Sequence, residues 1–310
     1  MKRLVLPWMA LLAAPASAQT ADAPFVWKEK ALGYQSLQQA VDAIGDGTGT
    51  IVVAPGSYRQ CAVQEAGRIA YVAAQPGTAT LEGRACDGKA ALVLGGTAAR
   101  VEGLVFANIR VSDRNGAGIR LEKGDLTVSE SLFRDSENGI LSADDPAGAI
   151  RIERSTFSGL GGCVEDYGCS HGIYVGGYGS LSVRRSRFER GTGGHYVKSR
   201  APRIEITDSS FDDTGGRATN YMIDLSNGAT GLIARNVFVQ GREKENYSAF
   251  VMVAPEGAEN DSTGLALVDN EASLAPGVSR STAFVADESG AAIRIENNRL
   301  GTGITRFEKR

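Results

Sequence analysis

Tryptophan, methionine and histidine are scarce in this sequence. Its 310 residues include 2 Trp, 4 Met and 2 His, whereas 39 are glycine. A chain with few bulky side chains and many glycines favours short strands joined by tight corners over packed helices. Long apolar runs are also missing beyond the first residues, so we expect no span of a membrane.

Cysteine is limited to four residues, and no C-x-x-C sequence is present. Zinc-binding and dithiol redox sites are therefore not indicated. An even number of cysteines is typical of disulfides formed in an oxidising compartment. Among the three possible connectivities we favour two local bridges, Cys61–Cys86 and Cys163–Cys169.

The first 18 residues have the three parts of a secretory signal peptide. Two basic residues precede an apolar run over residues 4–14, and an Ala-Ser-Ala sequence at 16–18 has the form of a cleavage site. The run is too short for a membrane anchor, which needs roughly 20 apolar residues. We expect residues 1–18 to be removed and residues 19–310 to form one periplasmic or secreted domain.

Neither sign of charge dominates the chain. Without the predicted signal peptide it holds 31 basic and 36 acidic residues. A mildly acidic protein has no overall positive field for nucleic acid, so we expect no nucleic-acid partner. Any anionic ligand must be held by a local group of cations.

A sequence template recurs through most of the chain. An apolar residue is followed five positions later by Phe, with Ser or Asn usually two positions before the Phe. A single repeat cannot bury its inner face alone, whereas stacked repeats form a continuous core. The repeats predict an all-β parallel β-helix with coils over about residues 50–301. The Phe residues of the template are Phe106, Phe133, Phe157, Phe188, Phe211 and Phe238.

Stacking in register also predicts a column of small polar residues at one corner. These side chains should hydrogen-bond from coil to coil, while the Phe residues stack inside. The column comprises Ser131, Ser155, Ser186, Ser209, Asn236, Asn270 and Asn298.

The segment before the first coil predicts a capping helix over about residues 34–44. Its apolar residues at 37, 40, 41 and 44 have helical spacing. A helix here would cover the exposed edge of the first coil.

This helix, followed by GTIVVAPGSY and Gly-rich coils, resembles the opening of the pectin-lyase-like superfamily. The resemblance extends over about residues 34–300 and implies a right-handed parallel β-helix. It implies no single activity, because that superfamily includes lyases, hydrolases, esterases, epimerases and non-enzymes.

The two histidines, His171 and His195, fall in consecutive coils. We therefore examine the strands that follow them for a functional site. Aligning the valines of YV in these coils places Tyr174 beside Tyr196. The next coil then brings Asp224 opposite a lysine, Lys198.

Strand alternation should point these polar side chains outward, with Arg200 on the same face. Such a patch suits an acidic polysaccharide, because cations bind its carboxylates. β-Elimination or C5-epimerisation of a uronate needs a neutralised carboxylate, a base and an acid. In our interpretation Arg200 or Lys198 neutralises the charge, His195 or Lys198 is the base, and Tyr174 or Tyr196 is the acid.

Three further residues are expected to contact the substrate: His171, Asp224 and Arg184, the last within the basic run VRRSRFER. Each candidate also has a structural interpretation. A corner histidine, a cross-strand Lys–Asp pair and stacked tyrosines are common in proteins without a site there. A non-catalytic carbohydrate-binding or envelope protein is therefore the main alternative.

A glycoside hydrolase is a third possibility, and it needs two facing carboxylates. The pairs Asp144-Asp145 and Asp212-Asp213 could supply them, or could hold Ca²⁺. Both pairs lie in Gly-rich corners, where Asp is the expected turn residue. We therefore predict no cofactor.

Overall fold

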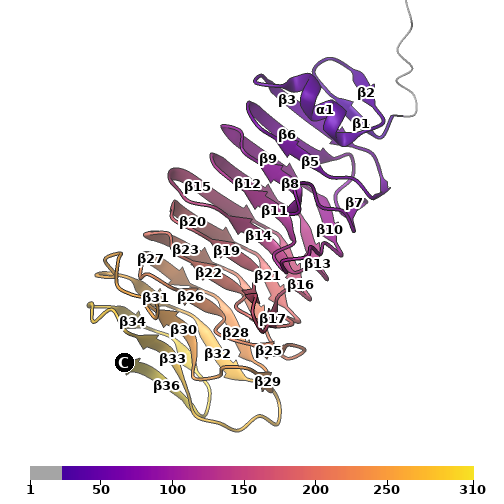
Figure 1. Ribbon diagram of the computed structural model, residues 1–310. Coiled ribbons are helices and arrows are strands. Elements are labelled where there is room, and N and C mark those ends of the chain that lie inside the picture. Colours follow the sequence, from indigo (N-terminus) through magenta and orange to yellow (C-terminus); the bar gives the residue numbers. More distant parts are fainter. Residues whose placement is uncertain (1–22) are drawn as a thin grey trace, which may run out of the picture.

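The computed structural model describes residues 23–310 as an elongated stack of coils (Figure 1). The predicted signal peptide, residues 1–18, lies outside the described residues. Each coil gives one strand to each of three sheets, here called sheets A, B and C, and strands of successive coils pair in parallel. The predicted parallel β-helix is confirmed.

Sheet A has twelve strands, of which β1 and β2 are antiparallel additions at its N-terminal end. In spatial order the strands are β2 (Leu32–Tyr34), β1 (Phe25–Trp27), β3 (Thr48–Val53), β6 (Arg68–Ala73), β9 (Ala98–Glu102), β12 (Asp125–Ser129), β15 (Asp145–Glu153), β20 (Tyr178–Arg184), β23 (Arg203–Thr207), β27 (Thr230–Ala234), β31 (Ala266–Val268) and β34 (Arg294–Glu296).

Sheet B has ten strands, and its centre carries the Phe residues of the template. The strands are β4 (Gly56–Tyr58), β7 (Ala79–Glu82), β10 (Leu104–Ala107), β13 (Leu132–Arg134), β16 (Thr156–Ser158), β21 (Arg187–Glu189), β24 (Ser210–Asp212), β28 (Val237–Gln240), β32 (Glu271–Leu274) and β35 (Arg299–Leu300).

Sheet C also has ten strands, and most of the predicted site residues lie within its middle strands or directly beside them in the chain. The strands are β5 (Ala62–Gln64), β8 (Ala90–Leu94), β11 (Ala117–Leu121), β14 (Asn138–Ser142), β19 (Ile173–Val175), β22 (Val197–Ser199), β26 (Ile223–Leu225), β30 (Ala249–Val253), β33 (Thr282–Asp287) and β36 (Ile304–Lys309).

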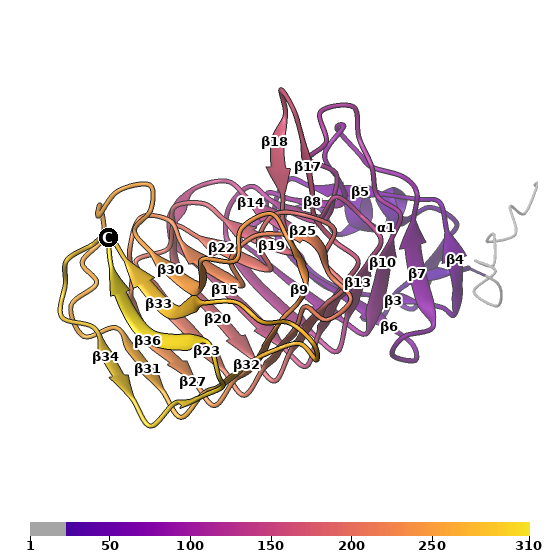
Figure 2. The ribbon, with the colours of Figure 1, turned by 90° about the horizontal axis from the view of Figure 1, so that it is seen from below.

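Two short strand pairs lie outside the three sheets. β17 (Gly162–Val164) and β18 (Gly168–Ser170) form a hairpin that projects from the stack (Figure 2). β25 (Arg217–Thr219) pairs in parallel with β29 (Glu243–Lys244) between sheets B and C. Both pairs are formed by segments that connect a strand of sheet B to the next strand of sheet C.

A helix, α1 (Leu37–Ile44), precedes the first coil. Its buried side chains pack against β1, β3 and β5, and it ends at Gly45, whose positive φ of 58° suits a residue without Cβ. The helix lies within the predicted range. Its action as a cap that keeps other chains from the end of the stack remains a prediction.

The interior is ordered by the aromatic column. The six Phe rings of the template stack with centroids 4.7 to 4.9 Å apart, which is the separation of neighbouring strands. Each such pair contributes about 0.5–1.5 kcal/mol beyond the buried area. The predicted stack is confirmed.

The corner between sheets A and B carries the predicted polar column. The backbone N–H groups of the column donate to the side chain one coil further on, for example Ser186 N–H to Ser209 Oγ at 3.0 Å and Asn236 N–H to Asn270 Oδ1 at 3.0 Å. The residue before each column member is held at positive φ without being glycine, as at Arg185 with φ 48°. The hydrogen bonds along the column offset the cost of that conformation.

Two disulfides join Cys61 to Cys86 and Cys163 to Cys169, as favoured from the sequence. The second bridge closes the β17–β18 hairpin. Within residues 23–310 no helix is long and apolar enough to cross a membrane.

Candidate functional site

The outer face of sheet C brings most of the predicted site residues together. Tyr174 on β19, Lys198 on β22 and Asp224 on β26 are direct neighbours in register. The predicted contact of Lys198 with Asp224 is confirmed. The predicted alignment of Tyr174 with Tyr196 is wrong by two residues, because β19 pairs Tyr174 with Lys198.

Tyr196 does not lie on this face. It is only 4 % exposed and belongs to the interior, where its phenol donates to Asp213 Oδ1 at 2.7 Å. Regular strand alternation begins at Val197, the first residue of β22, so the two consecutive residues Tyr196 and Val197 both face inward. The expectation that Tyr196 points to solvent is thereby corrected.

The two histidines stack on the outer face just before their strands. The rings of His171 and His195 are 5.1 Å apart, and the ring of Tyr221 continues the stack 5.6 Å from His195. His171 Nδ1 accepts the backbone N–H of His195 at 3.0 Å, and Asn138 Oδ1 accepts that of His171 at 2.7 Å. The bond to Nδ1 fixes the ring of His171, and the ring of His195 stacks on it.

Burial keeps both imidazoles neutral. It lowers the pKa of His171 well below the usual value, and the nearby His195 and Lys198 lower it further. Burial, with a smaller contribution from Lys198, lowers the pKa of His195 to about 3. Neither ring therefore carries a positive charge at neutral pH.

Asp224 joins the histidine stack to the lysine. Its Oδ2 lies 3.2 Å from His195 Nε2 and 3.6 Å from Lys198 Nζ. Burial raises the pKa of Asp224 to about 6, although Lys198 acts in the opposite direction. Its other oxygen, Oδ1, is buried without a hydrogen-bond partner among the described residues.

A residue that the sequence did not suggest completes the cluster. Glu256, in the segment after β30, places one carboxylate oxygen on Lys198 Nζ and the other on Arg200 Nη2. Burial opposes ionisation, yet the two cations outweigh it and lower the pKa of Glu256. Arg200 Nε also donates to the Tyr174 hydroxyl at 3.0 Å.

An open groove adjoins this cluster on the N-terminal side. Its volume is about 530 Å³, and Tyr174, Arg200, Arg120 and Asp144 are among its lining residues. We call it the site groove.

Arg184 lies elsewhere. It belongs to β20 of sheet A and pairs with Glu205 at 2.5 Å on the outer face of that sheet. A strand of sheet A and a strand of sheet C face different sides of the stack (Figure 2). The structure therefore separates Arg184 from the other predicted substrate-binding residues.

The paired carboxylates of the corners have different environments. Asp212 accepts the backbone N–H of Thr214 at 3.0 Å, as a turn residue does. Asp213 is instead fully buried and pairs with Lys244 at 3.1 Å, both side chains being 0 % exposed. Within residues 23–310 no group of three or more His, Cys, Asp or Glu side chains is arranged to hold a metal ion.

Comparison with known proteins supports the fold. Residues 90–300 match the family model described as the right handed beta helix region. An alginate lyase from Paenibacillus sp. str. FPU-7 superposes with a TM-score of 0.54 and 16% identity, over 88% of this chain and 94% of that one. Rice weevil pectin methyl esterase gives a TM-score of 0.50 and 8% identity, over 93% and 92% of the two chains.

A third similar structure is ORF18 of Geobacillus virus E2, with a TM-score of 0.52 and 12% identity over 85% of this chain. The match spans 56% of the viral chain, so this chain corresponds to little more than half of it. No curated protein matches the chain. At these identities the likenesses establish the fold and leave the activity open.

Proposed function

The chain belongs to the right-handed β-helix family, and from that premise we propose that it acts on an acidic polysaccharide at the outer face of sheet C, as a lyase or C5-epimerase. One observation carries the proposal. Lys198 and Arg200 together hold a single carboxylate, that of Glu256, beside the hydroxyl of Tyr174.

Glu256 supports the assignment of ligand class. Its carboxylate occupies the position between the two cations that the carboxylate of a uronate would take. Arg presents a planar fork of donors to such a group, and Lys presents a point charge. A substrate that displaces Glu256 would find both cations already positioned, with the site groove open beside them.

The same groups suit removal of the proton at C5 of the sugar. Arg200 neutralises the carboxylate, which makes that proton more acidic. Lys198 acts as the base in its neutral form, after its ammonium group has released a proton to solvent, and Asp224 Oδ2, 3.6 Å from Nζ, helps to position it. His195 orients Asp224 rather than contacting the sugar. His171 supports His195 through the ring stack.

The fate of the resulting carbanion distinguishes the two reactions. In a lyase the C4–O bond breaks, a C4–C5 double bond forms, and the leaving oxygen takes a proton from Tyr174. The hydroxyl of Tyr174 accepts a hydrogen bond from Arg200, so its own hydrogen is free to be donated. In an epimerase a proton returns to C5 on the opposite face, and no bond to oxygen breaks.

Purified protein should be incubated with alginate, pectate and a glycosaminoglycan in D₂O. Ultraviolet absorbance of the new double bond would identify a lyase, and deuterium at C5 without chain cleavage would identify an epimerase. Lys198→Ala should lower the rate by about 10²–10⁴-fold, the usual contribution of a general base. Lys309→Ala, which removes an exposed lysine from β36 of the same sheet, should leave it unchanged.

Two results would contradict the proposal. Retention of these polymers without turnover would favour the non-catalytic binding protein. Equal rates for Lys198→Ala and the wild type would show that the chemistry lies elsewhere.

A further inference from the structure

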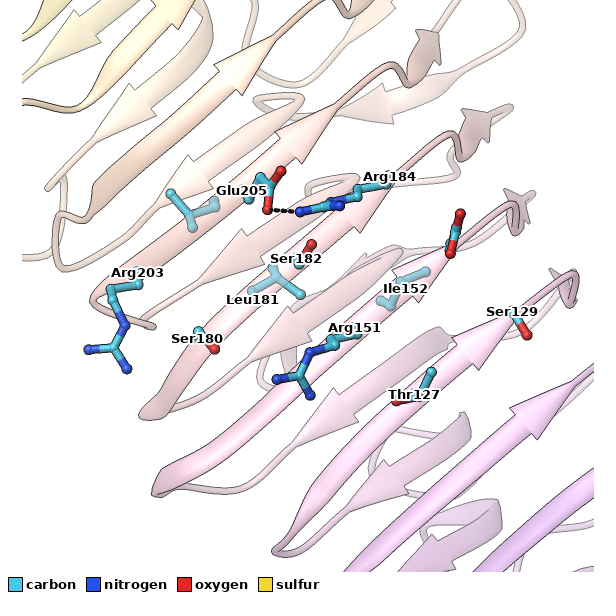
Figure 3. Close-up of a pocket in the computed structure, with 12 residues that line it drawn as sticks. Thr127, Ser129, Arg151, Ile152, Ser180, Leu181, Ser182, Arg184, Arg203 and Glu205 are labelled. Carbon is cyan, nitrogen blue, oxygen red and sulfur yellow. Dashed lines mark hydrogen bonds and ion pairs between the residues drawn. The ribbon is translucent and has the colours of Figure 1, made fainter. Parts of the chain in front are cut away.

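The structure contains a second polar groove, on the outer face of sheet A. One part, about 500 Å³ in volume, crosses β12, β15, β20 and β23 (Figure 3). Another, about 370 Å³, crosses β3, β6, β9, β12 and β15. The two parts share Thr127 and Arg151, so they form one groove, here called the sheet A groove.

The lining of this groove is rich in unused hydrogen-bonding groups. Arg151 and Arg203 are exposed and make no ion pair or hydrogen bond with any described residue, and Figure 3 shows both side chains extended from their strands. The hydroxyls of Thr127, Ser180 and Ser182 likewise have no partner within residues 23–310. Arg184, in contrast, is paired with Glu205.

Strand register places these groups in an ordered pattern. Arg151 adjoins Thr127 on one side and Ser182 on the other. Arg151 on β15 and Arg203 on β23 are two strands apart, which is about 10 Å along the stack at the usual strand spacing. A flat floor of small hydroxyl side chains with guanidinium groups at intervals suits an extended chain that carries carboxylates and hydroxyls.

A third hollow, about 390 Å³ in volume, connects this groove with the candidate site. It lies at the corner between sheets C and A. Arg200 and Asp144 line both this hollow and the site groove, whereas Arg203 lines both this hollow and the sheet A groove. The outer surface therefore offers a continuous polar path from Arg200 around the corner to Arg203 and Arg151.

We propose that the sheet A groove is a second binding site, which holds a distal part of an anionic polysaccharide chain whose reacting part lies on sheet C. The ligand class rests on the proposed function, but the groove itself does not depend on catalysis. The sheet A groove raises the affinity of the protein for long polysaccharide chains. A short oligomer that fills only the site groove cannot reach Arg203 and Arg151.

Binding should be measured by affinity electrophoresis and calorimetry in the Lys198→Ala background, so that turnover does not interfere. The probes are polymeric alginate and pectate, with their dimers for comparison and dextran as a neutral control. Adding Arg151→Gln and Arg203→Gln should weaken polymer binding about tenfold, the loss expected for two exposed ion pairs, and should leave dimer affinity within twofold.

The matched control replaces two exposed, unpaired arginines away from the groove, Arg84→Gln and Arg306→Gln, and should change neither affinity. Equal polymer affinity in the groove variant and its parent would overturn the inference, as would the absence of polymer binding in both. A stronger affinity for single-stranded DNA than for either polyuronate would also overturn it. If the wild type shows no turnover but the groove variant loses polymer binding, the groove stands and the proposed catalysis fails.

Discussion

The ionisation of His195 is strongly altered by its surroundings. Its ring lies between His171 and Tyr221, and its Nε2 faces Asp224. With a pKa of about 3 it stays neutral at pH values where an exposed histidine would be protonated. The ring is thus a neutral neighbour of Asp224, 3.2 Å from its Oδ2, and does not supply positive charge to the site.

This neutrality predicts a pH-dependent stability. The unfolded chain, with a histidine pKa near 6.5, binds more protons than the folded one between about pH 6.5 and pH 3. The contribution of His195 is therefore complete above pH 6.5 and is lost as the pH falls. Between pH 7 and pH 4 the loss is about 3 kcal/mol.

Denaturant unfolding at these two pH values checks the prediction. The free energy of unfolding of the wild type, minus that of His195→Gln, should decrease by this amount on going from pH 7 to pH 4. If the two proteins lose stability in parallel, the neutral buried imidazole is not the cause.

At the scale of elements, the β25–β29 pair depends on one buried ion pair. Asp213 receives hydrogen bonds from Tyr196, Thr219 and Lys244, and Lys244 also donates to the carbonyl oxygen of Asn220. Both charges are therefore compensated although water does not reach them. The network anchors the segment that leads into β26, the strand that carries Asp224.

Removing one partner of this ion pair should destabilise the folded protein. Lys244→Met leaves the carboxylate of Asp213 buried without its cation, and we expect a loss of about 3–5 kcal/mol in the free energy of unfolding. The double variant Asp213→Asn, Lys244→Met should be less destabilised than Lys244→Met, because no uncompensated charge remains. Urea unfolding of the wild type, the two single variants and the double variant measures this coupling. Additive losses of stability in the double variant would contradict the prediction.

The sequence predicted those elements that repeat and failed where the repeat is interrupted. The Phe column and the Ser/Asn column could be predicted because every coil obeys the same register. The position of Tyr196 could not, since it precedes the regular part of β22. Glu256 lies in an aperiodic segment 58 residues beyond Lys198, and no pattern in the chain relates the two.

For the whole molecule, stability should vary along the stack. Strands in the middle of each sheet have neighbours on both sides, whereas β34, β35 and β36 pair on one side only. In a linear array each unit is stabilised by its immediate neighbours, so the last coil should open at a lower free energy than the centre.

Hydrogen exchange followed by mass spectrometry tests this gradient. Amides of β34–β36 should exchange at least tenfold faster than those of β16, β21 and β24, because they lack one neighbouring coil. Uniform protection over all coils would show that the stack opens only as a single cooperative unit.

The coil-by-coil register has one further consequence, for how such a protein can change in length. Because Tyr174, Lys198 and Asp224 lie on adjacent coils, a whole coil inserted or deleted near either terminus should leave their mutual geometry intact. Gene segments that encode single coils can then be gained or lost without moving this cluster, so the length of the outer surface can evolve separately from the arrangement of these side chains.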